Sequence, residues 1–97
     1  MIKKRKTTAE KLYKAILKLE STEECAALFE DICTFQEIEA ISQRLEVAVE
    51  LYKGKSYTEV NKLTGASTAT ICRVSKALNY GNGGYRTVIE RLEKDDV

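Results

Sequence analysis

Apolar residues recur along most of this chain at intervals of three or four positions, the spacing that places side chains on one face of an α-helix. Three such stripes fill the first half of the chain: Leu12, Ile16 and Leu19; Cys25, Leu28, Phe29, Ile32 and Cys33; and Ile38, Ile41, Leu45, Ala48 and Tyr52. A last stripe, Val88, Ile89 and Leu92, predicts a helix from Tyr85 to about Lys94. No proline interrupts these stripes, which together predict an all-α protein.

Polar residues mark where the helices begin and end. Four S/T-x-x-E motifs can cap helix N-termini: Thr7/Glu10, Ser21/Glu24, Thr34/Glu37 and Ser56/Glu59. Lys53 and Gly54 form a natural stop after the third stripe. With two shorter helices between residues 57 and 78, the pattern predicts six helices.

The segment SYTEVNKLTGASTATICRVSKAL predicts a helix-turn-helix over residues 57–78. The motif requires an apolar residue in its first helix, a glycine five residues later that adopts a positive φ, and an apolar anchor six residues further on. Three residues have this spacing: Val60, Gly65 and Ile71. Asn61 and Thr64 fit less well, because the first helix usually has a small residue and an apolar residue at these positions.

The second helix of this motif has an apolar stripe that must pack inward: Ile71, Val74 and Leu78. That packing turns Thr68, Ala69 and Cys72 outward. A helix with short outward side chains can approach base edges in the DNA major groove. An ordinary helical hairpin without a nucleic-acid partner is the alternative.

The chain carries a formal net charge of +1, but its charge is unevenly distributed. Residues 1–19 hold seven basic residues against Glu10, and residues 20–52 hold nine acidic residues against Arg44. In residues 53–76, Glu59 is opposed by five basic side chains: Lys53, Lys55, Lys62, Arg73 and Lys76. A basic helix-turn-helix attracts DNA phosphates, although charge runs can also simply solvate helix faces.

The basic run from Lys3 to Lys6 precedes any apolar periodicity, so we expect a flexible basic arm over residues 1–7. Such an arm either reaches DNA phosphates or acts as a solubilising tail. No signal peptide follows it, and no apolar stretch approaches the roughly 20 residues of a membrane span. We therefore expect a cytoplasmic protein with no membrane partner.

Side chains that metal sites and enzymes commonly use are scarce. The chain has no histidine, and its cysteines, Cys25, Cys33 and Cys72, form no C-x-x-C pair. It contains neither a G-x-S-x-G motif nor a Walker-type phosphate-binding motif. We therefore expect no metal site, no cofactor and no catalytic residues, and the protein is predicted not to be an enzyme.

The first three predicted helices carry more apolar surface than the helix-turn-helix can cover. A homodimer is the economical way to bury that surface. Its twofold axis would also present two reading helices about 34 Å apart, one turn of DNA. The predicted partners are therefore a second copy of the chain and double-stranded DNA, which is read in the major groove.

The run TFQEIEAISQRLEVAVELYKGKSYTEVNKLTGASTATICRVSKAL, residues 34–78, resembles the bacterial Trp repressor family, in particular its shorter relatives of the YerC/YecD group. The resemblance is centred on LTGASTATICR. It implies a six-helix Trp-repressor-like fold and a single DNA-binding domain over residues 1–97. It also implies an intertwined homodimer in which the N-terminal helices of two chains interlock.

The resemblance further implies which residues face DNA. These are Thr58 and Asn61 in the first helix of the motif, and Thr68, Ala69 and Cys72 in the second. Because the family has basic residues at the positions of Thr58 and Asn61, we expect the same docking mode on a different operator sequence. Other DNA-binding candidates, several of them suited to phosphates, lie beside them: Lys55, Lys62, Ser67, Arg73 and Lys76.

In the Trp repressor, a threonine carbonyl and two arginines hold the co-repressor, and these align with Thr34, Arg44 and Arg73. A family glycine that leaves room for the indole aligns with Val74, whose methyl groups argue against tryptophan as the ligand. The set therefore predicts a smaller amino acid or another carboxylate as effector. Surface ion pairs with nearby glutamates are the alternative role for both arginines.

Together these features predict a sequence-specific DNA-binding transcriptional regulator, a repressor, that acts as a homodimer and responds to such an effector. The alternative is a helical protein-interaction module that keeps the fold and presents its basic face to an acidic protein. Only the first hypothesis requires specific DNA binding.

Overall fold

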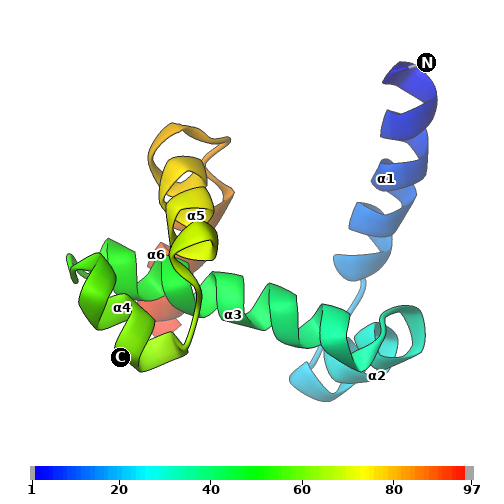
Figure 1. The fold of residues 1–97 in the computed structure, drawn as a ribbon. Coiled ribbons are helices and arrows are strands. Elements are labelled where there is room, and N and C mark those ends of the chain that lie inside the picture. The colour runs from blue at the N-terminus through cyan, green and yellow to red at the C-terminus, as the bar shows by residue number, and fades with distance from the viewer. Residues whose placement is uncertain (1, 96–97) are drawn as a thin grey trace. The chain divides into compact units, whose positions relative to one another are not determined.

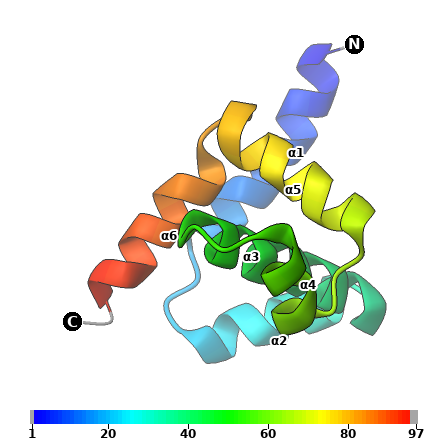
Figure 2. The same ribbon diagram turned by 60° about the vertical axis from the view of Figure 1, so that its left-hand side comes forward.

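Helices account for most of the backbone that the computed structural model describes, residues 2–95; side chains are described for residues 9–95. Six α-helices follow one another (Figure 1; Figure 2): α1 (Ile2–Ile16), α2 (Thr22–Ile32), α3 (Phe35–Tyr52), α4 (Tyr57–Thr64), α5 (Thr68–Tyr80) and α6 (Gly84–Asp95). The described backbone contains no strand, and the all-α, six-helix prediction is confirmed. None of the described helices has the length and apolar character needed to cross a membrane.

The chain divides into two compact units, Met1–Ile38 and Glu39–Val97. The two units differ in their buried side chains. Among residues 9–95, every buried side chain belongs to the second unit. Within the described side chains, only that unit has a hydrophobic core of its own.

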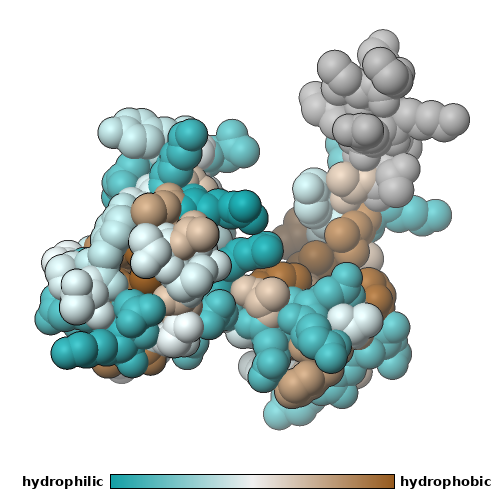
Figure 3. All heavy atoms as spheres, viewed as in Figure 1, coloured by the Kyte–Doolittle hydropathy of each residue, from teal (hydrophilic) through white to brown (hydrophobic). Residues whose placement is uncertain are grey.

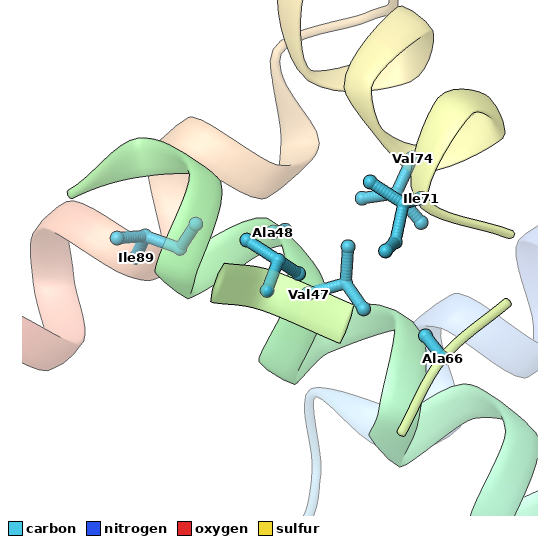
Figure 4. Close-up of a cluster of buried hydrophobic side chains, with 7 residues drawn as sticks. Val47, Ala48, Ala66, Ile71, Val74 and Ile89 are labelled. Carbon is cyan, nitrogen blue, oxygen red and sulfur yellow. The ribbon is translucent and has the colours of Figure 1, made fainter. Parts of the chain in front are cut away.

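The second unit is organised around the inward stripe of α5. Ile71, Val74 and Leu78 are only 1%, 1% and 6% exposed, as the apolar spacing predicts. Ile71 and Val74 belong to a cluster whose other buried members come from α3, α4, the turn after α4, and α6 (Figure 4): Val47, Ala48, Val60, Ala66 and Ile89. Burying a side chain as large as valine or isoleucine contributes about 1.5–3 kcal/mol. This cluster fixes α5 against three other helices.

Capping hydrogen bonds form at three of the four predicted S/T-x-x-E motifs. At α4, Ser56 Oγ accepts from the Glu59 N–H at 3.2 Å, and a Glu59 carboxylate oxygen accepts from the Ser56 N–H at 2.9 Å. These bonds hold the pKa of Glu59 below its usual range. Thr34 and Glu37 form the same reciprocal pair before α3, and Ser21 caps α2.

The structure differs from the prediction at the N-terminus. Helix α1 begins at Ile2, so it runs through most of the predicted flexible arm, residues 1–7, and past the predicted cap at Thr7. The reason is local propensity: lysine and arginine are good helix formers, and neither glycine nor proline interrupts the run. The basic side chains of the predicted arm lie outside the described residues.

Apolar side chains of the first unit are left at the surface. None of its described side chains, residues 9–38, is buried. Leu17, Ile32 and Phe35 are 83%, 60% and 70% exposed. Figure 3 shows hydrophobic surface over α1 and α2. Residues 9–38, with no buried side chain, lack the hydrophobic stabilisation that folding requires.

Candidate nucleic-acid interface

Helices α4 and α5 form the predicted helix-turn-helix, packing against each other on either side of a turn at residues 65–67. Gly65 ends α4 in the left-handed region with a φ of 75°, and its N–H donates to the Asn61 carbonyl at 2.8 Å. A Cβ placed on Gly65 would meet no atom within 4 Å, so glycine is favoured there by the dihedral angle alone. The second helix continues to Tyr80, beyond its predicted end.

Side-chain hydrogen bonds hold this turn. The Asn61 amide nitrogen donates to the Ala66 carbonyl at 2.7 Å. Thr64 Oγ1 donates to the Val60 carbonyl at 2.7 Å and accepts from the Ala66 N–H at 3.2 Å. From α3, the Gln43 amide nitrogen donates to the Thr64 carbonyl at 3.3 Å. Polar side chains therefore satisfy three backbone groups at the turn: the Thr64 carbonyl, the Ala66 N–H and the Ala66 carbonyl.

These contacts give two positions a role in the turn. Asn61 and Thr64 depart from the usual motif in sequence, and both use their polar groups to stabilise the turn. Asn61, which was predicted to face DNA, is exposed, and its amide nitrogen is engaged within the protein. The sequence contains the relevant signal, since amide and hydroxyl side chains beside a glycine commonly hydrogen-bond the backbone of a turn.

The outer face of α5 presents the predicted small side chains. Thr68, Ala69 and Cys72 are exposed, and their shortness allows the helix to approach a base edge closely. Ser67, another predicted DNA contact, is the N-cap of α5, where its Oγ accepts from the Thr70 N–H at 3.2 Å. This bond satisfies one of the free N–H groups in the first turn of the helix.

Basic side chains border the same two helices. Lys62, Arg73 and Lys76 are exposed, and among residues 9–95 none of them has a carboxylate within ion-pair distance. Thr58 on α4 is exposed as well. These charges are free to attract phosphate groups from solution.

Lys55, also predicted to contact DNA, forms an ion pair with α3. Its ammonium lies 2.6 Å from a Glu50 carboxylate oxygen, and Lys53 lies 3.8 Å from the other oxygen. The hydrogen bond from Lys55 is the main cause that lowers the pKa of Glu50. The pair spans five residues across the end of a helix, outside the i,i+3 and i,i+4 spacings that sequence analysis recognises.

The residues predicted to bind an effector have different surroundings. Arg44 lines a hollow of about 600 Å³ whose other walls include four larger apolar side chains: Ile41, Leu45, Tyr85 and Val88. Arg73 is not among the residues that line this hollow, and Thr34 belongs to the first unit. Val74, predicted to limit the ligand space, packs in the core. Within the described residues, no cluster of His, Cys, Asp or Glu side chains could hold a metal ion.

We expect Asn61→Ala to destabilise the turn, because it removes the donor to the Ala66 carbonyl. The free energy of unfolding should fall by about 1 kcal/mol, as measured by urea unfolding at fixed protein concentration. Lys62→Ala is the matched control, since it truncates the next exposed side chain of α4 and should change stability by less than about 0.5 kcal/mol. An equal loss in both variants would show that the Asn61 bond does not stabilise the turn.

The chain is similar to known proteins over nearly its whole length. The family model described as Trp repressor protein matches residues 7–93. The chain is 44% identical over 88 residues to the uncharacterized protein YerC of Bacillus subtilis (strain 168). The aligned residues cover 91% of this chain and 85% of YerC.

Two solved structures share the fold. A TrpR-like protein from Eubacterium eligens ATCC 27750 superposes with a TM-score of 0.86 at 49% identity, covering 90% of each chain. A candidate Trp repressor from Staphylococcus aureus gives a TM-score of 0.86 at 42% identity, covering 90% of this chain and 87% of the other. On this sequence and structural similarity, the chain belongs to the Trp repressor family.

Proposed function

We propose that the protein is a sequence-specific DNA-binding transcriptional regulator, a repressor, that acts as a homodimer. The observation that carries this proposal is the outer face of α5. Its short side chains are exposed, its opposite face is fixed in the core, and basic side chains without carboxylate partners lie beside it. Membership of the Trp repressor family supports the same class of function.

In this proposal α5 enters the major groove, where Thr68, Ala69 and Cys72 meet base edges. Lys62, Arg73 and Lys76 bind phosphates and hold the helix in register. Thr58 faces DNA from α4. Lys55 and Ser67 act indirectly, by holding the start of α4 and the start of α5.

Binding of the protein to a library of genomic DNA fragments, followed by sequencing, should enrich a palindromic motif. Thr68→Glu should weaken binding to that motif by about 1–3 kcal/mol, because a carboxylate cannot replace the small hydroxyl at a base edge. Thr22→Glu, which adds the same charge to the acidic first turn of α2, should bind nearly as wild type. If no motif is enriched, the protein is instead an interaction module that keeps the fold.

A homodimer is proposed because the first unit leaves its apolar side chains uncovered. Residues 9–38 contain no buried side chain, although Leu17, Ile32 and Phe35 together present a large apolar surface. A second copy of the chain has the same surface, and a twofold interface is self-complementary. Intertwining of the N-terminal helices would give each first unit the core it lacks.

We expect analytical ultracentrifugation to find a dimer at micromolar concentration. Phe35→Asp should shift the protein toward monomer or unfold it, because a carboxylate would replace an aromatic ring that is 70% exposed in the single chain. Tyr80→Asp replaces an aromatic residue of the second unit that is 86% exposed, and it should leave the dimer intact. A wild-type protein that sediments only as a monomer would contradict the proposal.

An effector is proposed at the hollow lined by Arg44, since a guanidinium against apolar walls suits a small carboxylate with an apolar side chain. The resemblance to the Trp repressor also implies a role for the Thr34 carbonyl and Arg73, but neither residue lines this hollow in the described chain. Equilibrium dialysis against amino acids other than tryptophan and against small carboxylates should find a ligand, and Arg44→Ala should abolish its binding. Failure of every compound to bind would overturn this part of the proposal.

A further inference from the structure

A second hollow, of about 460 Å³, opens beside the C-terminal half of α5. Its walls come from three helices of the second unit: Leu51 and Tyr52 of α3, Ser75, Leu78 and Asn79 of α5, and Arg86 of α6. The sequence pattern predicts no binding role for any of these residues. The polar members are a guanidinium, an amide and two hydroxyl groups, which favour a ligand that accepts hydrogen bonds.

The hollow adjoins the outer face of α5. From Thr68, steps of four, three and four residues lead to Cys72, Ser75 and Asn79, so these four residues form one stripe along the helix. Thr68 and Cys72 belong to the surface proposed to enter the DNA groove. Ser75 and Asn79 continue that stripe into the hollow, toward α6.

Arg86 is held in place before any ligand arrives. Its Nε donates to the Leu78 carbonyl at 3.1 Å, and Nη2 donates to Asn79 Oδ1 at 3.3 Å. Its guanidinium carbon lies 5.6 Å from the centroid of the Tyr52 ring, within the range of a cation–π contact. Asn79 is fixed in turn, because its amide nitrogen donates to the Ser75 carbonyl at 2.9 Å.

Two donors of the hollow are still available. Within the described residues, Nη1 of Arg86 makes no hydrogen bond, and the guanidinium has no carboxylate at ion-pair distance. Glu90, one turn further along α6, accepts from the Tyr52 hydroxyl at 2.8 Å. Ser75 Oγ only accepts, at 3.4 Å from the Asn79 amide nitrogen, so its proton can still be donated.

We infer that this hollow binds one phosphate of the DNA backbone, with Arg86 Nη1 and the Ser75 hydroxyl as donors. A guanidinium group is well suited to bind a phosphate oxygen. Because three contacts already hold the Arg86 side chain, binding a phosphate would cost little further side-chain entropy. Arg86 would then anchor the C-terminal end of α5, as the basic residues near its first turns anchor the other end. The inference rests on the proposed DNA-binding function.

The test compares Arg86→Gln with Arg91→Gln, an exposed arginine of the same helix that does not line the hollow. Binding to the enriched DNA motif is measured by fluorescence anisotropy from low to high salt. For each protomer of the proposed dimer, Arg86→Gln should reduce the magnitude of the slope of log K against log salt concentration by about 0.9. It should also weaken binding roughly tenfold for each lost charged contact. Arg91→Gln should keep the wild-type slope.

Ser75→Ala tests the same site without disturbing Arg86, and it decides the question if Arg86→Gln fails to fold. It should weaken binding roughly threefold to tenfold. With the contacted phosphate of each half-site replaced by a neutral methylphosphonate, wild type and Ser75→Ala should bind equally. If neither variant changes affinity or salt slope while wild type binds the motif, the phosphate site is wrong and DNA binding stands. If wild type enriches no motif, the proposed function itself fails.

Discussion

Burial of one face of α5 is the constraint on which the rest of this structure depends. Ile71 and Val74 are almost completely removed from solvent by residues of α3, α4 and α6. Because the positions of side chains around a helix are fixed by its periodicity, burial of one face of α5 also determines which residues lie on the opposite face. Thr68, Ala69 and Cys72 are therefore exposed as a consequence of core packing. The hydrophobic core thus determines which side chains α5 presents to a partner.

Much of this arrangement could be predicted from the sequence because it follows from local rules. Apolar periodicity located the six helices, three S/T-x-x-E motifs located caps, and the spacing around Gly65 located the turn. The start of α1 was missed because a run of lysine and arginine contains no stop signal. The division into two compact units could not be predicted, because periodicity shows which face of a helix is apolar, but not whether the same chain covers it.

The candidate site was harder to predict, because its polar side chains are engaged in ways that spacing does not reveal. Asn61 and Lys55 resemble ligand-facing residues when only their type and position are considered, and Thr64 resembles a departure from the motif. In the structure they bond the turn or the end of α3. Arg86 shows the opposite case, since a residue without a sequence signal is oriented by three contacts from two other helices. Long-range polar contacts of this kind can be found only once the chain is folded.

The open space around Gly65 has a consequence for how this fold varies between relatives. A side chain at that position would collide with nothing, so the barrier to replacing the glycine is the torsional preference of the new residue. Asparagine tolerates left-handed backbone better than most residues. A homologue with asparagine there could keep the same bend between its counterparts of α4 and α5. A pattern that demands glycine at this corner would overlook such a protein.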